Sequence, residues 1–279
     1  MTTPTIPTAA PLPELVSARL ACAREAARAA GERSLEAFGS LSIEVITKGD
    51  GSPVTAVDRA CEAVVRDVVL GAFPDDAVLG EELGETPGGS GFRWIVDPID
   101  GTASFIRGVP LYACLIGIEH RPSGAMVAGV IHMPALGETV WAGAGSGAWH
   151  VPRAGAEPRA ARVSAAEDLS RACVVTTSPD YFRISGCAEV YDRLWRAAGM
   201  NRGWSDAYGP LLLATGRIDA MAEPHMHPWD AAALLPIVEE AGGRFSDWRG
   251  ERSVHNGTAL MTNGRLHGPM LEIVRPAAG

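Results

Sequence analysis

The chain has 279 residues, and its 24 Lys and Arg against 33 Asp and Glu give a formal net charge of −9. Apolar residues make up 47% and charged residues 20%, which is typical of a folded globular protein and excludes global disorder. The acidic balance argues against nucleic acid as a partner and against binding to an anionic membrane surface.

Cysteine content and the N-terminal sequence indicate the compartment. The five cysteines are an odd number without CxxC spacing, which favours a reduced, cytoplasmic protein with buried thiols. The first 30 residues lack a basic segment followed by an uninterrupted apolar run, so we expect no secretory signal. The apolar runs fall short of the roughly 18 residues that suggest a membrane span.

The N-terminal half is predicted to combine two helical segments with strands. A frayed tail is expected over 1–11, and Ala, Leu, Arg and Glu dominate 13–38, which predicts one or two amphipathic helices. A loop over 47–55 precedes a second helix with a valine-rich face. A glycine-rich connection follows the strand at 77–79. Strands are predicted over 42–46, 77–79, 93–96, 111–119, 126–133, 138–142 and 147–151.

The C-terminal half is predicted to alternate strands and helices after a surface linker over 152–168. Strands are predicted over 172–176, 218–222, 244–246 and 259–262, and helices over 188–198, 208–215, 230–241 and 269–274. Pro236 lies inside the third of these helices, where a kink is expected. Because hairpins occur together with helix crossovers, the pattern predicts a layered α+β sandwich.

Two carboxylates are expected at the end of the strand over 93–96. Asp97 and Asp100 are separated by Pro98 and Ile99, and Gly101 follows directly, so a tight turn brings both side chains toward one space. Backbone N–H groups after Gly101 favour an anion. Carboxylates and anion-binding amides can share one site if a cation lies between them. Oxygen ligands in this pattern favour a hard divalent cation, with Mg²⁺ preferred over the others. The alternative is an Asx-type turn that caps a helix.

Further acids stand at predicted element ends. Glu81 and Glu82 follow a strand, and alone they are best explained as solvated loop charges. Asp230 opens an apolar helix and Asp58 lies near the start of another, where a plain N-cap is the alternative for both. Their shared placement, rather than any one of them, points to a functional site.

Four segments together resemble the inositol monophosphatase-like family. GEE at 80–82, WIVDPIDGT at 94–102 and WDAAALLPIVEEAGG at 229–243 are similar to its signature segments, and VTAVD at 54–58 is similar to its upstream acidic motif. The resemblance implies Mg²⁺-dependent hydrolysis of small phosphate monoesters on an αβαβα sandwich, often in a homodimer. It spans 12–275 and implies one phosphatase domain over 12–279, with a metal and phosphate side at about 12–150 and a substrate side at about 151–279.

The resemblance also implies which residues bind metal. Glu81, Asp97 and the carbonyl of Ile99 are similar to the ligands of the tightest metal ion. Asp97, Asp100 and Asp230 are similar to those of a second, and Glu81 is expected to help with a third. Two or three Mg²⁺ ions per site are therefore expected, and they would invert the repulsion between an acidic protein and a phosphate dianion.

Phosphate and water contacts follow from the same resemblance. The amides of Gly101 and Thr102 resemble the family's phosphate cradle. Glu81 and Thr102 resemble the pair that positions the attacking water, with Asp58 behind the Thr102 hydroxyl. Asp100 is also expected to contact the substrate.

The identity of the alcohol depends on the C-terminal half. TTSPDYF at 176–182 and GWSDAYGPLLLATGRIDAMAEP at 203–224 are similar to the histidinol-phosphate phosphatases of the family. Asp206 would suit the cationic amine of histidinol phosphate, because a charged hydrogen bond is stronger than a neutral one; the alternative is a helix N-cap. Glu223 and Asp230 are expected to contact the substrate, but Glu223 does not discriminate between an ammonium and an inositol hydroxyl.

Three alternatives to histidinol phosphate hydrolysis stay open. An inositol-1-monophosphatase or a phosphatase of broad specificity would share the mechanism. A catalytically silent relative is disfavoured because each ligand position keeps its residue, and a metabolite-binding module would show binding without turnover. Trp204 and Arg107 depart from the family pattern near the pocket.

Two motifs are interpreted as decoys. GAGSG at 143–147 matches only part of a dinucleotide-binding loop and leads into a predicted strand. His225 and His227 are spaced like a metal pair but are expected at the pocket rim or on the surface.

Overall fold

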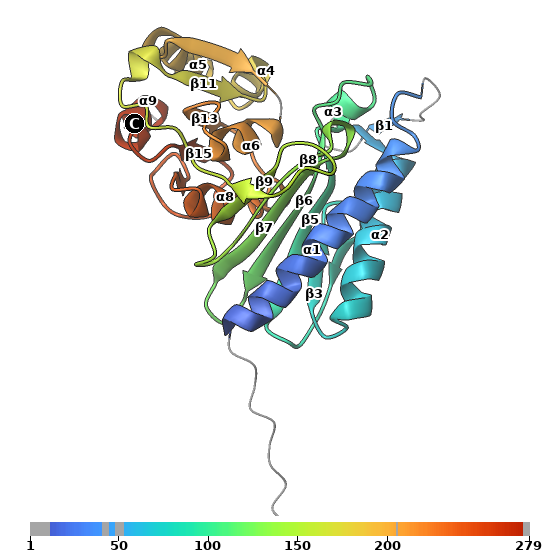
Figure 1. The fold of residues 1–279 in the computed structure, drawn as a ribbon. Coiled ribbons are helices and arrows are strands. Elements are labelled where there is room, and N and C mark those ends of the chain that lie inside the picture. Colours follow the sequence, from blue (N-terminus) through green and yellow to red (C-terminus); the bar gives the residue numbers. More distant parts are fainter. Residues whose placement is uncertain (1–11, 41–44, 48–52, 205, 276–279) are drawn as a thin grey trace, which may run out of the picture.

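The computed structural model describes residues 12–40, 45–47, 53–204 and 206–275. Their helices and sheets stack in the order helix, sheet, helix, sheet, helix (Figure 1). The predicted α+β layered sandwich is therefore confirmed. The tail predicted over 1–11 lies outside the described residues.

The larger sheet has eight strands in the order β10-β9-β8-β7-β6-β5-β3-β4. They are β3 (Ala77–Gly80), β4 (Gly84–Thr86), β5 (Phe92–Asp100), β6 (Ala113–His120), β7 (Ala125–Met133), β8 (Glu138–Gly143), β9 (Ala148–Val151) and β10 (Arg159–Ala160). Only the β3–β5 pair among them is parallel. Helices α1 (Leu12–Leu35) and α2 (Ala56–Ala72) cover one face, and β1 (Val45–Thr47) pairs with β2 (Pro53–Thr55) nearby.

The smaller sheet has five strands in the order β12-β11-β13-β15-β14. They are β11 (Cys173–Thr176), β12 (Met200–Gly203), β13 (Ala220–Glu223), β14 (Arg244–Ser246) and β15 (Ala259–Thr262). Its outer face packs against α4 (Pro179–Ile184), α5 (Ala188–Ala197) and α9 (His267–Val274). The middle layer holds α6 (Tyr208–Ala214), α7 (Pro228–Ala231) and α8 (Leu234–Glu240). The short helices are α3 (Thr102–Phe105), η1 (Pro134–Leu136) and η2 (Leu169–Arg171).

Strand β5 presents alternate residues to two different layers. Trp94 and Val96 are fully buried in the cluster under α1 and α2, whereas Ile95 is buried in the cluster of the middle layer. Because side chains alternate along a strand, Asp97 faces the middle layer with Ile95. The strand thus carries an acid toward α7 from an otherwise apolar stretch.

Two facing glycines bring the middle layer onto the large sheet. Gly117 on β6 pairs with Gly129 on β7. A Cβ atom on Gly117 would lie 2.6 Å from the carbonyl carbon of Ala232, and one on Gly129 would lie 2.2 Å from the carbonyl oxygen of Ala233. The backbone between α7 and α8 therefore rests directly on the two strands, which places α7 at the ends of β5 and β6.

We expect Gly129→Ala to lower the free energy of unfolding by about 2–3 kcal/mol, because the methyl group would force a packed backbone away from the sheet. Urea unfolding followed by circular dichroism would measure this change. Gly71→Ala is the matched control. Gly71 lies in α2 with open space around its Cβ position, so alanine there should raise stability slightly. Equal effects of the two variants would contradict the close contact.

The prediction of one continuous helix over 230–241 is wrong. The structure has two helices, α7 and α8, separated by Ala232 and Ala233. Because α8 begins at Leu234, Pro236 lies in its first turn, where a backbone N–H has no partner within the helix. The expected kink at Pro236 is therefore replaced by a break before it.

Several predicted loops contain strands. Residues 53–55 form β2, and the glycine-rich connection after β3 contains β4. The predicted surface linker contains β10, and Ala161 after it is 2% exposed. Strand β5 does not stop at Asp97 but pairs on to Asp100, with an irregularity between these two positions. Sequence analysis also missed α4 and β12.

Two further expectations concern membranes and thiols. Among the described residues, no helix is both long and apolar enough to cross a membrane. All five cysteines are free. Cys61 and Cys114 are buried as expected, whereas Cys22, Cys173 and Cys187 are half-buried.

Candidate active site

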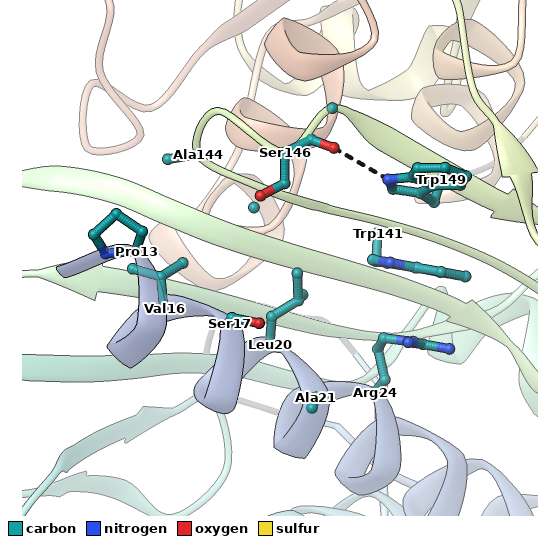
Figure 2. Close-up of a pocket in the computed structure, with 12 residues that line it drawn as sticks. Pro13, Val16, Ser17, Leu20, Ala21, Arg24, Trp141, Ala144, Ser146 and Trp149 are labelled. Carbon is teal, nitrogen blue, oxygen red and sulfur yellow. Dashed lines mark hydrogen bonds between the residues drawn. The ribbon is translucent and has the colours of Figure 1, made fainter. Parts of the chain in front are cut away.

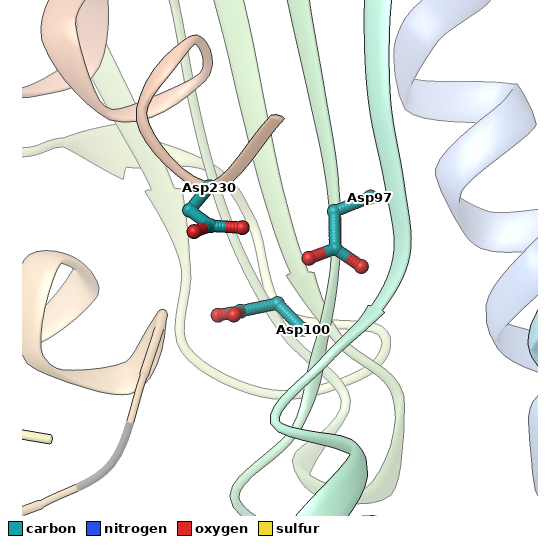
Figure 3. Close-up of side chains that lie close together, drawn as sticks. All are labelled: Asp97, Asp100 and Asp230. Carbon is teal, nitrogen blue, oxygen red and sulfur yellow. The ribbon is translucent and has the colours of Figure 1, made fainter. Parts of the chain in front are cut away.

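Two acids stand where β5 becomes irregular. Asp97 is 3% exposed, and its Oδ1 accepts a hydrogen bond from the Ile99 N–H at 3.0 Å. Pairing with β6 shifts between Asp97 and Asp100, so the chain bends there and both side chains turn toward the middle layer (Figure 3). The predicted turn at this sequence is thus an irregular continuation of the strand.

Asp230 approaches the same space from α7. It is the third residue of this short helix, and its Oδ2 accepts from the His227 N–H at 2.7 Å. The plain N-cap weighed for Asp230 is wrong, because His227 holds that position. Each of Asp97, Asp100 and Asp230 offers one carboxylate oxygen within 4.8 Å of those of the other two (Figure 3).

The electrostatics of this acid triad favour a cation. Burial raises the pKa of Asp97 well above its ordinary value, and the neighbouring charges of Glu81, Asp100 and Asp230 raise it further. The pKa of Asp100 is also raised well above its ordinary value, first by burial and then by the charges of Asp206 and Asp230. Buried like charges require a compensating positive charge if they are to stay ionised. A set of carboxylate oxygens fits a hard divalent ion such as Mg²⁺.

Glu81 joins the triad from the neighbouring strand. It follows β3, which runs parallel to β5, so the two strands end on the same side. Its backbone N–H donates to the carbonyl of Val96 at 3.1 Å, directly before Asp97. The hydrogen bond and charge of Glu81 both raise the pKa of Asp97, which places the two carboxyl groups together. The alternative of a solvated loop charge does not hold for Glu81.

A short helix begins directly after the acids. Gly101 has φ of 86°, in the left-handed region, and precedes α3. A Cβ atom there would lie 3.0 Å from Asp206 Oδ2 and from the Leu111 carbonyl, so glycine is required both for conformation and for space. The first backbone N–H groups of a helix lack partners within it, which suits the predicted phosphate contacts of Gly101 and Thr102.

A chain of hydrogen bonds orients the Thr102 hydroxyl. It lies 3.1 Å from Asp58 Oδ1 and 3.0 Å from the Ile99 carbonyl oxygen. Asp58 Oδ2 accepts from the backbone N–H of Thr55 at 2.8 Å and from its hydroxyl at 2.5 Å. Asp58 is thus in a capping box at the start of α2, and its other oxygen remains for Thr102. The N-cap alternative for Asp58 is wrong, because Thr55 holds that position and Asp58 is the third residue of the helix. The predicted contact between Asp58 and the Thr102 hydroxyl is present.

Asp206 lies close to Gly101, as the distance from a Cβ atom there shows. The N-cap weighed for Asp206 is not formed, because α6 has Ala207 at its N-cap position without a side-chain hydrogen bond. Instead Asp100 Oδ2 accepts from the Ala207 N–H at 2.6 Å. This hydrogen bond joins the large sheet to the start of α6.

Glu223 ends β13 and is 3% exposed. Its Oε1 accepts from the Thr177 N–H at 2.6 Å. Burial raises the pKa of Glu223 to about 8, and the charge of Asp206 contributes. An approaching ammonium would favour the ionised form of this carboxyl group.

We expect Glu223→Gln to change how stability depends on pH. Between its ordinary pKa of 4.5 and the folded value of about 8, the folded protein retains a proton that the unfolded chain has lost. The contribution of Glu223 to stability therefore falls as pH rises through this range. The variant should gain on the order of 2 kcal/mol relative to wild type between pH 5 and pH 8. Urea unfolding in EDTA at both pH values would test this, and a constant difference would contradict it.

Tyr181 is a further candidate for the site that sequence analysis did not single out. It lies on α4, and after burial the charges of Asp206, Asp100, Glu223 and Asp230 are the causes that raise its pKa. The quoted segment TTSPDYF contained this tyrosine, but nothing in its spacing indicated that α4 would face the acids.

The first decoy, GAGSG at 143–147, contributes no residue to the acid triad. GAGSG forms the turn between β8 and β9, where Glu240 accepts from the N–H groups of Gly145 and Gly147 at 2.8 Å. A cavity of about 220 Å³ lies between this turn and α1, lined by Arg24 and Trp141 among others (Figure 2). None of the candidate catalytic acids lines it.

His225 and His227 contact each other edge to face, with ring centroids 4.9 Å apart, and His227 stacks on Trp229. His225 is exposed and His227 is half-buried, and the backbone N–H of His227 donates to Asp230. Trp204 is half-buried, and Arg107 is an exposed residue that donates to the Ala103 carbonyl at 3.1 Å.

Comparison with known proteins gives a consistent result. A model of the inositol monophosphatase family matches residues 16–277. The chain is 44% identical over 243 residues to a histidinol-phosphatase of Chlorobaculum parvum, covering 87% of this chain and 91% of that protein. It is 40% identical to a histidinol-phosphatase of Mycobacterium tuberculosis, covering 84% and 89%. The structure of extragenic suppressor protein suhB from Bartonella henselae matches with a TM-score of 0.84 at 28% identity, covering 94% of this chain and 100% of that one.

Proposed function

The chain belongs to the inositol monophosphatase family, and we propose that it is a Mg²⁺-dependent phosphate monoester hydrolase whose substrate is L-histidinol phosphate. The observation that carries the proposal is the acid triad, set beside Glu81 and the start of α3. The histidinol-phosphatases among its relatives support this choice of substrate.

The metal ligands that we propose are Glu81, Asp97, Asp100, Asp230 and the carbonyl of Ile99. Bound Mg²⁺, in two or three positions, supplies Lewis acidity toward the phosphate and lowers the pKa of water. The oxygen-only donor set and the raised pKa values of Asp97 and Asp100 fit such ions.

The chain's own residues would bind the phosphate and orient the attacking water. The N–H groups of Gly101 and Thr102 donate to phosphate oxygens. When the Thr102 hydroxyl donates to Asp58, its lone pairs are left to accept a hydrogen bond from the water. Glu81 accepts from the same water and draws off its proton during attack. Covalent catalysis by serine or cysteine is not needed.

The alcohol portion of the substrate would lie between Asp206 and Glu223, with Asp100 and Asp230 at its phosphate end. Two carboxyl groups favour a cationic alcohol such as histidinol, because a charge-assisted hydrogen bond contributes more than a neutral one. Inositol-1-phosphate or a broad range of polyol phosphates is the second candidate, and the family's name favours it.

We propose that the protein is a cytoplasmic homodimer. Strand β12 is an edge strand carrying exposed Met200, and Trp195 on the adjacent α5 is 56% exposed. The open edge of a strand beside an exposed indole is suited to burial in a symmetric interface. Light scattering after gel filtration should give twice the chain mass of 29.2 kDa.

Phosphate release from L-histidinol phosphate and inositol 1-phosphate would test the proposed reaction. We expect turnover with Mg²⁺ that EDTA abolishes. A preference for histidinol phosphate of about a hundredfold in kcat/KM, or about 3 kcal/mol, would support the substrate assignment. Comparable rates for the two compounds would support the assignment as a hydrolase but contradict the assignment of L-histidinol phosphate as its preferred substrate. No Mg²⁺-dependent release from either compound would contradict the proposed function.

A further inference from the structure

A buried ion pair on α2 lies against the turn that carries Glu81. Glu62 is fully buried, and its Oε1 accepts from Arg66 Nε at 2.8 Å. Neither residue belongs to the motifs described above. Burying such a pair has a large desolvation cost, so it is weak evidence for stability and invites another explanation.

Glu62 holds the backbone directly after Glu81. Its Oε2 accepts from the Glu82 N–H at 2.7 Å, and its Oε1 lies 3.3 Å from the Leu83 nitrogen, as an acceptor of that N–H. The turn approaches Glu62 so closely that a Cβ atom on Gly80 would lie 1.9 Å from Glu62 Oε1. The residues on both sides of Glu81 are therefore packed against one carboxylate.

Arg66 continues the same support along the turn. Its guanidinium donates to the Thr86 hydroxyl at 2.7 Å and to the Gly84 carbonyl at 2.5 Å, as well as to Glu62. Glu62 and Arg66 together engage the turn from residue 82 to residue 86. A planar guanidinium with several fixed donors is suited to this bridging role in a way that lysine is not.

The contacts of Glu62 and Arg66 lie at the end of β3 that carries Glu81, the proposed metal ligand. The Glu81 N–H is tied to the Val96 carbonyl, one residue before Asp97, and the next N–H is tied to Glu62. The peptides on either side of the Glu81 Cα atom are thus fixed, one to β5 and the other to α2. This leaves only side-chain rotation to decide where the Glu81 carboxylate lies.

We propose that Glu62, oriented by Arg66, is a positioning residue that holds Glu81 beside Asp97 for cation binding. The inference rests on the metal role of Glu81 in the proposed function. Partners behind a metal ligand typically change metal affinity or activity by about 10–100-fold when they are mutated. Glu62→Gln keeps the size of the side chain but turns an N–H donor toward the turn where an acceptor is needed.

Isothermal titration of the substrate-free protein with Mg²⁺ is the first readout. Glu62→Gln should weaken Mg²⁺ binding about tenfold. In turnover assays it should raise the Mg²⁺ concentration for half-maximal rate by a similar factor and lower kcat, with the substrate KM at saturating Mg²⁺ unchanged. Arg66→Lys should shift Mg²⁺ binding in the same direction, because lysine cannot reach both Thr86 and Gly84. It also decides the question if Glu62→Gln does not fold.

Asp76→Asn is the matched control. Asp76 is 1% exposed, pairs with buried Arg19 at 2.7 Å, and stands at the opposite end of the same strand β3. The Asp76→Asn substitution should lower the melting temperature of the protein without changing its affinity for Mg²⁺. If Glu62→Gln also lowers only the melting temperature, the positioning role is overturned while the proposed function stands. If the wild-type protein itself binds no Mg²⁺, the metal role of Glu81 in the proposed function fails first.

Discussion

Asp97→Asn should reduce Mg²⁺-dependent phosphate release at least about a thousandfold, because it removes a charge that the proposed site shares between cations. Asparagine retains an oxygen that accepts from the Ile99 N–H, so the irregular end of β5 should keep its shape. Initial rates of phosphate release over a range of Mg²⁺ concentrations would measure the loss, which high Mg²⁺ should not restore.

The same variant should be at least as stable as wild type in EDTA. Burial and three neighbouring acids disfavour the ionised form of the Asp97 carboxyl group. Asparagine carries no charge, so it removes both of these destabilising effects. Wild type should gain thermal stability from Mg²⁺, and the variant should gain little, because only binding to the folded state stabilises it. Asp67→Asn, an exposed position on α2, should behave as wild type in both measurements. A near-normal kcat for Asp97→Asn would contradict the ligand assignment.

Asp206→Ala should lower kcat/KM for L-histidinol phosphate about 10–100-fold while changing that for inositol 1-phosphate much less. The charged hydrogen bond lost with the cationic alcohol is expected to contribute about 1.5–3 kcal/mol. Most of the effect should appear in KM, because the contact is remote from the phosphate. Steady-state kinetics on both substrates would measure kcat and KM for each and show whether the loss is selective for L-histidinol phosphate.

Asp180→Ala is the matched control for Asp206→Ala. Asp180 belongs to the quoted segment TTSPDYF and forms an exposed pair with Arg183 at 3.3 Å. Its loss should affect neither substrate selectively, since an exposed pair contributes little. An equal effect of Asp206→Ala on both phosphate esters would remove Asp206 from the specificity argument and leave the hydrolase assignment unchanged.

The pairing of Asp97 with Asp100 could be predicted because local sequence controls much of its geometry, whereas Glu81 and Asp230 were expected beside them only from the family resemblance. Asp97 and Asp100 lie three residues apart around a Pro-Ile pair, and the left-handed Gly101 ends the strand, so a short segment brings them together. Asp58 takes its place from a capping box with Thr55, which also depends on local sequence. Each of these features needs only a few consecutive residues.

The break between α7 and α8 could not be predicted from the local pattern. Helical periodicity continues through 230–241, and a run of alanines favours an unbroken helix. The break accompanies the close approach of Ala232 and Ala233 to Gly117 and Gly129, which are about 100 residues away in the sequence. Tertiary packing therefore overrides local propensity there.

The role of Glu62 was hidden by an ordinary pattern. Glu62 and Arg66 are four residues apart, which is the spacing of an exposed ion pair on a helix surface. On α2 this pair instead faces the turn between β3 and β4 and is buried. Only the packing of the helix against the sheet distinguishes the two situations.

The facing glycines on β6 and β7 bear on how this sequence can evolve. Neither Gly117 nor Gly129 is among the proposed ligand, phosphate or substrate contacts, yet any side chain there would displace the segment that carries Asp230. Selection for catalysis should therefore act on two strand positions remote from chemistry. In a saturation mutagenesis screen for activity, both should be as intolerant as the acids, whereas Gly124 in the β6–β7 turn, with open space around it, should accept asparagine.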